Sequence, residues 1–370
     1  MPIDQISIYN FKSIQSLENF KIKPINVLIG ANGSGKSNFI QFFKLLHYIY
    51  NQKLKYYVAN NGYAEKLLYM GRKKSFFLGG EIIFRSDEDK NINNAYKFRL
   101  VPQSDDEGFY FEYDQAGYYN VFSKRYNEKL DYKNLGSEGR QESRLKENSL
   151  LRADFLRYYF NSFRIFHFHD TSSNSPLKQP CQVEDNEFLR EDGANLPAFL
   201  YAISQTSEFK MIEYVIQSIA PFFGRFNLRP NRDNKNYISL NWIHRNSDHY
   251  FNAHSLSDGT LRFIALITLL LQPEPPKTII IDEPELGLHP AAIYKLAEIV
   301  KMVSQESQII ISTQSPYLID EFDPENIIIT ERENNQSIFK RLSKQNLQKW
   351  LDEYTLSQLW TKNIIGGLPK

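Results

Sequence analysis

The sequence has almost no cysteine and almost no net charge. Its 370 residues include one cysteine, Cys181, which excludes an intramolecular disulfide and any zinc or iron–sulfur site built on several thiolates. With 44 basic and 43 acidic residues, the formal net charge is +1. No overall excess of charge therefore indicates nucleic acid or an acidic membrane as a partner. We expect a protein of a reducing compartment, whose charged partners contact a local patch.

Long apolar runs are missing as well. The start of the chain, MPIDQISIYNF, lacks the basic and apolar regions of a signal peptide. The most apolar run, FIALITLLL from Phe263 to Leu271, falls short of the roughly 20 residues that span a bilayer. The chain is long enough for one large domain or two ordinary ones. We expect a soluble, cytoplasmic protein that does not enter a membrane.

A glycine-rich motif follows the apolar segment INVLI. Residues Gly30 to Ser37, GANGSGKS, match G-x-x-x-x-G-K-[ST], and a helical pattern runs from Ser37 to about Tyr50. Glycines let backbone N–H groups surround phosphate oxygens at a helix N-terminus, and Lys36 adds a charge for the β- and γ-phosphates. We expect Lys36 to be a surface-facing charge and not a core residue. A strand-to-helix turn without a ligand is the less favoured interpretation. The predicted nucleotide contacts are Asn32, Gly33, Ser34, Gly35, Lys36, Ser37 and Asn38.

A pair of carboxylates follows a second apolar strand. In TIIIDEPELGLHP, four residues from Thr278 precede Asp282 and Glu283. This spacing places both carboxylates at the C-terminal end of a buried strand, where ligands bind in such sheets. Asp282 and the Ser37 hydroxyl are the predicted ligands of Mg²⁺, and Glu283 is the predicted base for the water that attacks the γ-phosphate. A solvated acidic turn is the alternative.

A third motif, LSDGT, opens a helix between the first two. Ser257, Asp258 and Gly259 taken alone predict an ordinary helix N-cap. Lys36 and Asp282 are much farther apart in the sequence than a compact small-molecule kinase requires. The order of the three motifs therefore favours a larger nucleotide-binding machine, and the kinase remains a third, disfavoured possibility.

Together, GANGSGKSN, LSDGT and IIIDEPELGLHP resemble the SMC/RecF branch of ABC-type ATPases. That branch includes stand-alone bacterial ATPases similar to those of phage-defence systems and of overcoming-lysogenization nucleases. The resemblance covers residues 5–50 and 254–341 best. It implies an α/β P-loop NTPase fold, an ABC-type ATPase head with a mixed sheet, an antiparallel β insertion and a small helical lobe.

The resemblance also implies ATP and Mg²⁺ as ligands and a homodimer. Two heads of this family sandwich ATP, so Ser257 and Gly259 of one chain are expected to face the nucleotide held by Lys36 and Ser37 of the other. A helix N-terminus with unpaired N–H groups suits that task. The family's partners are DNA, or a separate nuclease or effector protein, and its settings include DNA repair and phage defence.

Two sequence features depart from the family pattern. Asp258 stands where transporter-type members have glycine, and the strand segment ISTQSP carries Gln314 where many relatives have histidine. Gln314 is assigned to the catalytic group with Glu283. A glutamine donates a hydrogen bond to a phosphate oxygen but exchanges no proton near neutral pH, so slow hydrolysis is expected.

The family resemblance also suggests roles for residues of two further segments. The first strand, ISIYNFKSI, is similar to that of the family, which implies that Asn10, Phe11 and Lys12 lie near the base or the phosphates. No glutamine occupies the expected glutamine loop. The segment RIFHFHDTS is the best candidate, and polar residues in a strand-end turn explain it equally well. Its polar positions are His167, His169 and Asp170.

The chain is predicted to be a single ATPase head with several parts. The parts are a P-loop core (1–50 and 254–341), a β-rich insertion with a basic polar loop (51–165), a helical lobe (166–253) and a C-terminal helical tail (342–370). Residues 131–148 are expected to form a mobile loop or a frayed helix. Residues 124–164 hold ten Lys or Arg and six Asp or Glu, which indicates a solvated face or a DNA contact.

Two hypotheses of function remain open. The first is an ATPase whose heads close on ATP and open after hydrolysis, and thereby control DNA or an effector protein. The second is a slowly hydrolysing, nucleotide-dependent scaffold that holds an effector protein and does not bind DNA itself. ATP turnover with and without DNA distinguishes them, since phosphate contacts make any DNA effect fade with salt.

Overall fold

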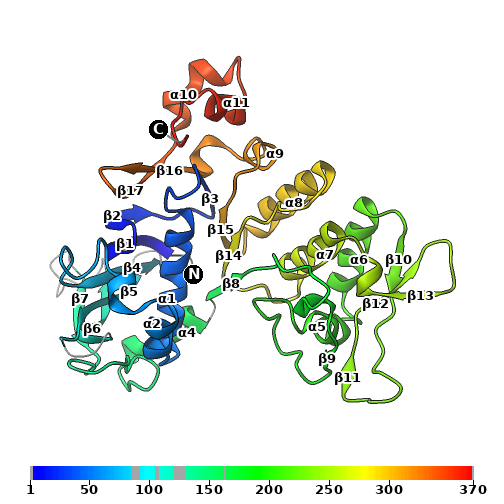
Figure 1. Cartoon of the computed structure of the whole chain (residues 1–370), viewed down its shortest axis with the longest axis horizontal. Helices are drawn as coiled ribbons and strands as arrows, with labels where there is room; N and C mark the ends of the chain where they lie inside the picture. Colours follow the sequence, from blue (N-terminus) through cyan, green and yellow to red (C-terminus); the bar gives the residue numbers. More distant parts are fainter. Residues whose placement is uncertain (1–2, 86–91, 105–107, 121–129, 162, 369–370) are drawn as a thin grey trace. The chain divides into compact units, whose positions relative to one another are not determined.

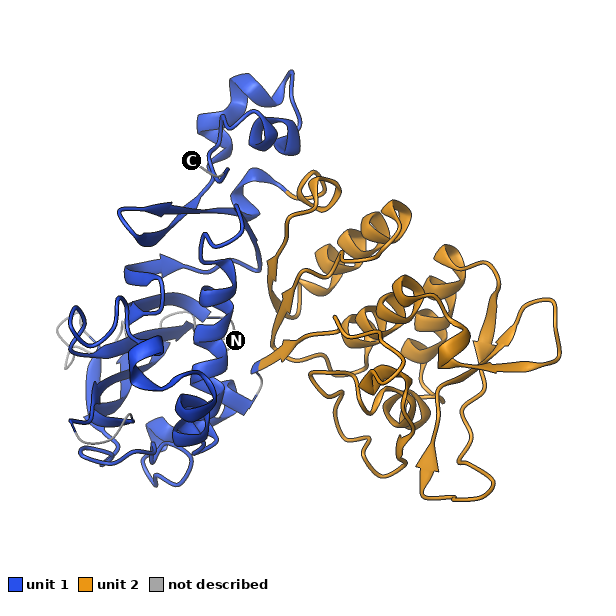
Figure 2. Ribbon diagram, viewed as in Figure 1, with its two compact units in different colours: residues 1–163, 323–370 blue, residues 164–322 orange. Residues whose placement is uncertain are grey.

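The computed structural model describes residues 3–85, 92–104, 108–120, 130–161 and 163–368. These residues form two compact units (Figure 2). Unit 1 consists of residues 1–163 and 323–370, and unit 2 consists of residues 164–322. Among the described helices, none is long and apolar enough to cross a membrane.

An antiparallel sheet and the helix α1 (Lys36–Tyr50) form the largest part of unit 1 (Figure 1). One face of α1 is rich in phenylalanine because these residues recur at helical spacing. Phe42 stacks on Phe98 of the sheet and meets Phe11 edge to face, with ring centroids 6.1 Å and 5.6 Å apart. The strands, in spatial order, are β2 (Ile14–Lys21), β1 (Ile3–Phe11), β4 (Leu78–Arg85), β5 (Ile92–Pro102), β6 (Phe109–Asn120) and β7 (Asp131–Asn134).

The first half of the sequence and its end share a second group of strands in unit 1. β3 (Ile25–Ile29), completely buried, pairs in parallel with β16 (Ile327–Glu333), and β16 pairs antiparallel with β17 (Gln336–Arg341). The mixed sheet that the family resemblance implies is thereby confirmed. The helices α10 (Lys344–Leu351) and α11 (Leu356–Thr361) follow β17.

The segment 131–148, predicted to be a mobile loop or a frayed helix, consists of a short strand followed by a loop. It opens with β7 and then turns back over buried Asp114, whose carboxylate accepts hydrogen bonds from Ser137 and Ser143. Burial raises the pKa of Asp114, while the two serine hydroxyls act in the opposite direction. These contacts are made by residues far apart in the sequence, which local composition does not reveal. The start of the basic segment, residues 124–129, lies outside the described residues.

The remaining helices of unit 1 are short. α2 (Leu54–Asn60) and α3 (Tyr63–Leu67) follow α1, and α4 (Leu151–Asn161) packs beside α1 and the sheet. Tyr50 of α1 stacks on Phe160 of α4, with ring centroids 5.6 Å apart. β8 (Phe163–Phe166) then leads into unit 2.

Unit 2 contains two parallel strands with their helices. β14 (Thr278–Asp282) pairs in parallel with β15 (Gln308–Ser312), and all five residues of β15 are buried. α7 (Asp258–Leu271) precedes β14, α8 (Pro290–Val303) connects the two strands, and α9 (Pro316–Ile319) follows β15. The right-handed crossover typical of parallel strands requires such an intervening helix.

The region 166–253 of unit 2 holds both helices and short strands. Its helices are α5 (Leu196–Ala202) and α6 (Ser207–Ile219), and α6 packs on α7. A three-stranded antiparallel sheet combines β10 (Phe223–Phe226), β12 (Asn241–His244) and β13 (Tyr250–Asn252). A smaller pair is formed by β9 (Cys181–Gln182) and β11 (Tyr237–Ile238).

Candidate functional site

The glycine-rich loop of unit 1 joins β3 to α1 and has the backbone of a phosphate-binding loop. α1 begins at Lys36, and no side chain caps its N-terminus, a position where main-chain N–H groups and the helix dipole favour an anion. The hydroxyl-bearing Ser37 is exposed, as are Asn32 and Gly33. The loop therefore offers main-chain donors and one accessible hydroxyl at the positive end of a 15-residue helix.

Gly35 shows why this loop needs glycine. Its φ angle is +119°, a conformation that side chains rarely adopt, and a Cβ atom there would lie 2.0 Å from the Ser337 Oγ. The loop is thus closed on its inner side by the β16–β17 hairpin and leaves the outer side for a ligand. Ser34, next to it, is buried, and its Oγ has no hydrogen-bond partner among the described residues. A close-fitting cradle with an unsatisfied hydroxyl is compatible with a bound triphosphate.

Lys36 is not the surface-facing charge that the sequence predicted. It is only 6% exposed, and its Nζ donates to the carbonyl oxygens of Gly30 at 2.6 Å and Ala31 at 3.1 Å. The lysine thus folds back over its own loop and binds two of its carbonyls. Lys36 therefore stabilises the loop as well as supplying a charge for phosphate.

A chain of polar contacts fixes the other end of the loop. The Asn38 amide donates to Ser13 Oγ at 2.7 Å, the Ser13 and Ser337 hydroxyls are 2.6 Å apart, and Ser337 donates to the Ser34 carbonyl at 2.6 Å. Since the Ser337 proton goes to that carbonyl, Ser13 is the donor in the serine pair. Asn38, a predicted nucleotide contact, is thus linked to the glycine-rich loop through Ser13 and Ser337.

Lys12 lies close to this network. Its Nζ donates to Gln41 Oε1 on α1, and burial lowers the pKa of its ammonium group, with Lys44 acting in the same direction. The ring of Phe11, the preceding residue, is fully buried against Phe42. Asn10 uses its carbonyl to accept the Tyr69 N–H at 3.0 Å.

A polar cavity of about 510 Å³ adjoins these residues within unit 1. Lys12, Ser13 and Asn38 line one part of it, while Lys66 and Arg332 contribute further positive charge. This volume lies within the range of small-molecule sites. The complete lining is Lys12, Ser13, Asn38, Asn61, Lys66, Leu68, Tyr69, Met70, Arg332 and Asn335.

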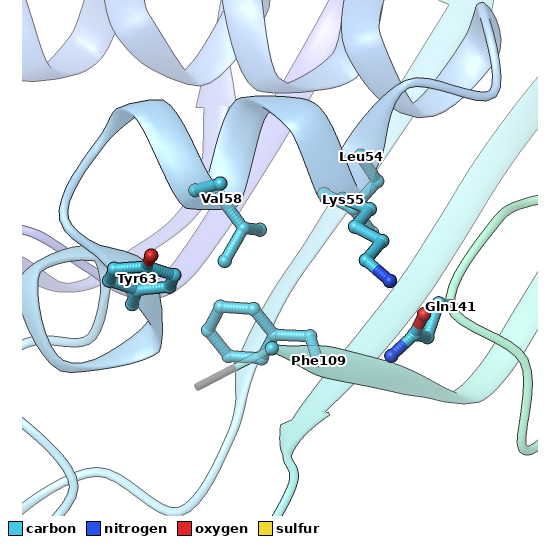
Figure 3. Close-up of a pocket in the computed structure, with 8 residues that line it drawn as sticks. Leu54, Lys55, Val58, Tyr63, Phe109 and Gln141 are labelled. Atoms are coloured by element: carbon cyan, nitrogen blue, oxygen red, sulfur yellow. The ribbon is translucent and has the colours of Figure 1, made fainter. Parts of the chain in front are cut away.

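A second pocket of unit 1 has a different character. Figure 3 shows Val58, Tyr63 and Phe109 around a small, largely apolar space, with Lys55 and Gln141 at its side. Its volume is about 60 Å³, far below that of a nucleotide site. The pocket is therefore too small to hold a nucleotide.

The predicted carboxylates lie in unit 2, at the C-terminal end of β14. Asp282 Oδ1 accepts a hydrogen bond from Ser312 Oγ on the neighbouring β15. Glu283 has a φ angle of +43°, and its N–H donates to the Ser312 carbonyl at 2.9 Å. Its Oε1 accepts the Gln314 Nε2–H at 2.9 Å. The structure thus brings Asp282, Glu283 and Gln314 together, and the strained backbone at Glu283 is typical of a functional position.

Glu285 is a member of this cluster that the sequence interpretation missed. One carboxylate oxygen accepts both the Thr313 hydroxyl and the Gln314 backbone N–H, the latter at 3.0 Å. The other oxygen, Oε2, is buried without a partner among the described residues. Burial raises the pKa of Glu285, and the Thr313 hydroxyl opposes that effect. The sequence does show Glu285 as the third acidic residue of the stretch DEPE. Such a stretch also fits an ordinary solvent-exposed turn, so it does not reveal that Glu285 is buried.

The candidate glutamine loop also contacts the backbone of Asp282. His169 Nε2–H donates to the Asp282 carbonyl at 2.7 Å. Buried Arg262 of α7 holds the same segment, because its guanidinium donates to the carbonyls of Phe168 and His169, both at 2.8 Å, and to that of Leu286. Asp170 instead closes an exposed turn through the Ser172 N–H. His167 uses its backbone N–H to reach the Glu191 carbonyl.

The third motif forms the N-terminus of α7. Ser257 is exposed, and its Oγ accepts the Thr260 N–H at 3.2 Å, so the N-cap expected from the sequence is present. Exposed Asp258 pairs with Lys178 at 3.0 Å, and that hydrogen bond lowers the pKa of Asp258. A Cβ at Gly259 would lie 2.3 Å from the Gly287 carbonyl oxygen. Gly259 therefore permits close approach of α7 to the loop that follows Glu285.

The comparison with protein families matches these motifs to one family model. Residues 25–320, which include all three motifs, match the family described as "AAA domain, putative AbiEii toxin, Type IV TA system". The chain belongs to this family. Within it, the residues described above are consistent with an ABC-type ATPase of the SMC/RecF branch. No curated protein matches the chain closely enough to count as a relative.

Solved structures support the same fold. The chain is similar to an Smc head bound to the C-winged helix domain of ScpA, with a TM-score of 0.63, 16% identity, and coverage of 94% of this chain and 100% of the other. A second similar structure is an Smc head with an extended coiled coil, bound to the C-terminal domain of ScpA from Pyrococcus furiosus. Its TM-score is 0.58 at 16% identity, with 95% and 98% of the two chains covered. The predicted α/β P-loop ATPase fold is therefore confirmed.

Proposed function

We propose that this member of the family binds and hydrolyses ATP, and that ATP drives two chains to associate. The observation that carries the proposal is the uncapped start of α1, where glycine backbone, buried Lys36 and exposed Ser37 meet. Main-chain N–H groups at such a site bind phosphate oxygens, and Lys36 exchanges its carbonyl contacts for the β- and γ-phosphates. The neighbouring polar cavity with Lys12 takes the nucleoside end.

The carboxylate cluster of unit 2 supplies the groups for hydrolysis in this proposal. In this proposal Asp282 and Ser37 would hold Mg²⁺, which would neutralise charge on the phosphates. Glu283 orients the attacking water and accepts its proton. Gln314 fixes the Glu283 side chain through its amide, and Glu285 fixes the backbone of Gln314.

ATP turnover tests this assignment. Glu283→Gln should leave ATP binding intact and slow single-turnover hydrolysis by at least about a hundredfold, the low end for a positioned general base. The matched control is Glu306→Gln, which changes an exposed glutamate of the same unit. Hydrolysis that is equally fast in Glu283→Gln and the control would remove Glu283 from the mechanism.

For the wider role, we propose that ATP-dependent association controls a macromolecular partner, either DNA or a separate nuclease or effector protein. The Smc heads similar to this chain were solved with a bound ScpA domain, which supports a protein partner. The similarity of the motifs to ATPases of phage-defence and DNA-repair systems supports those settings.

The scaffold hypothesis keeps one observation in its favour. Gln314 stands where a histidine would offer proton exchange, and its amide is already engaged with Glu283. A slow enzyme that persists in its ATP-bound form would hold an effector for longer. Turnover that DNA does not change at any salt concentration favours this scaffold, whereas stimulation that fades with salt favours control of DNA.

A further inference from the structure

The three-stranded sheet of unit 2 has two faces of opposite character. Its inner face is aromatic: Trp242 of β12 is 3% exposed and stacks between buried Phe223 of β10 and Phe251 of β13, which is 37% exposed. The ring centroids are 5.9 Å and 5.1 Å from that of Trp242. Because successive side chains of a strand alternate between faces, the residues between these aromatics point to the other side.

The outer face carries a row of three residues in register across the strands. Arg225 of β10 pairs with Ile243 of β12, and Ile243 pairs with Tyr250 of β13. Tyr250 is 64% exposed, Arg225 is exposed, and Ile243 is half-buried between them. Arg245, two residues after Ile243 and also exposed, extends the same face beyond the end of β12.

A bulge at Gly224 produces this arrangement. The pairing register shifts between Phe223 and Arg225, which lets Phe223 and Phe226 both point inward while Arg225 points outward. A Cβ at Gly224 would lie 2.8 Å from the Ile243 carbonyl oxygen, so only glycine fits. The outward arginine is therefore set by the fold of the sheet and is not a random surface residue.

The charged groups on this face are poorly neutralised. Among the described residues, neither Arg225 nor Arg245 forms a salt bridge, and the Tyr250 side chain has no hydrogen bond or ring contact. Arg225 does interact electrostatically with half-buried Glu213 of α6, which binds the Phe226 N–H. In the β12–β13 hairpin, the acidic residue is Asp248. The face thus combines an exposed aromatic ring with two exposed arginines, Arg225 on the far strand and Arg245 beyond the end of β12.

We propose that this face binds single-stranded nucleic acid, with a base stacked on Tyr250 and phosphates at Arg225 and Arg245. Aromatic rings bind unpaired bases of any sequence, and arginines follow the phosphate backbone. A duplex fits less well, because its bases are already stacked. A protein partner is also disfavoured, since protein interfaces need an apolar centre, and the row described on this face holds one aromatic ring and one half-buried isoleucine.

This surface does not depend on the proposed ATPase activity, so the two can fail separately. The test is fluorescence anisotropy of the full chain without nucleotide, using a labelled thymidine oligonucleotide of about 16 residues, the upper site size of single-strand modules. A uridine oligonucleotide and a DNA duplex are measured beside it. The two single strands reveal which sugar is preferred, and tighter binding of the duplex would overturn the proposal.

Two kinds of variant identify the contacts. Tyr250→Ala should weaken binding at least about fivefold, and Tyr250→Phe should restore it, because stacking needs the ring and not the hydroxyl. Arg225→Ala and Arg245→Ala should each lower the slope of log K against log salt by about 0.7, the value for one phosphate contact on a single strand.

Matched controls lie in unit 1. Tyr56→Ala removes a ring of similar exposure, 62%, and Arg140→Ala removes an exposed arginine of the basic segment noted in the sequence. Both should bind like the wild type. The proposal is overturned if no single strand binds, if Tyr250→Ala binds like the wild type, or if Arg140→Ala lowers the salt slope while Arg245→Ala does not. Unchanged melting of Tyr250→Ala, expected for so exposed a side chain, excludes unfolding as the cause.

Discussion

Replacing Lys36 by alanine should destabilise unit 1 even without nucleotide. The ammonium group donates to the carbonyls of Gly30 and Ala31 in a buried position. Each hydrogen bond to a charged group contributes about 1.5–3 kcal/mol. Without the lysine, water can bind the two loop carbonyls and compensate for part of the lost hydrogen-bond energy. We therefore expect a loss of about 2–4 kcal/mol in the free energy of unfolding of unit 1. For a unit of this size that corresponds to a melting temperature lower by about 5–10 °C.

Thermal melting and ATP binding together check this expectation. Lys36→Met keeps most of the apolar stem and isolates the contribution of the ammonium group, while Lys53→Ala removes an exposed lysine from the region after α1 as a control. Both Lys36 variants should lose ATP binding. If Lys36→Ala melts like the control, the carbonyl contacts contribute nothing to stability, and the reasoning from burial is refuted. If it binds ATP as tightly as the wild type, the phosphate cradle itself is wrongly assigned.

Three further predictions concern the glycine-rich loop, buried Glu285, and the LSDGT motif at the N-terminus of α7. Gly35→Ala should abolish ATP binding and lower the melting temperature, because the added Cβ meets Ser337 Oγ. Adding Ser337→Ala to this variant should restore part of the stability, because the hydroxyl is removed, while the strain from the positive φ angle of residue 35 remains. Burial raises the pKa of Glu285, so the folded protein binds the proton of this carboxyl more tightly than the unfolded chain does. The protein therefore loses stability as the pH rises from the ordinary pKa of a glutamate through the higher pKa of Glu285 in the folded state. Glu285→Gln should therefore gain in melting temperature relative to the wild type over that window, and a pH-independent difference would contradict it. In light scattering with Mg²⁺ and ATP, Glu283→Gln should raise the dimer fraction and Ser257→Arg should abolish that gain; a dimer that forms without nucleotide and survives Ser257→Arg would place the interface elsewhere.

The features that the sequence predicts well are those encoded within a short segment. The strand, glycine loop and helix around Lys36 follow one another directly, and α1 begins within one residue of the expected position. Asp282 likewise ends a buried strand whose apolar run is continuous. In both cases the hydrophobic pattern and the glycine or acidic residues that end it specify the geometry without help from the rest of the chain.

The features that the sequence does not reveal depend on contacts between distant segments. A lysine is usually exposed, so its residue type predicts a surface position. Lys36 is instead buried, with its ammonium group bound to two carbonyls of the loop. Glu285 becomes buried only when the segment after β15 folds over it. Arg225 faces outward because of a bulge, and a register shift of one residue reverses the face of every side chain that follows. The boundaries of the predicted insertion, helical lobe and tail remain predictions.

Gln314 has a different meaning once its contacts are known. The sequence suggested slow hydrolysis because glutamine exchanges no proton. In the structure its amide binds Glu283, and its backbone N–H binds Glu285. A glutamine amide carries two N–H donors, so one can hold Glu283 while the other reaches a phosphate oxygen, whereas a neutral histidine has a single N–H for both tasks. Under the proposed function, Gln314 positions the Glu283 carboxylate and leaves proton transfer to Glu283. Turnover that is slow in the wild type and lost in Glu283→Gln agrees with this division of roles, while turnover that survives without Glu283 excludes it.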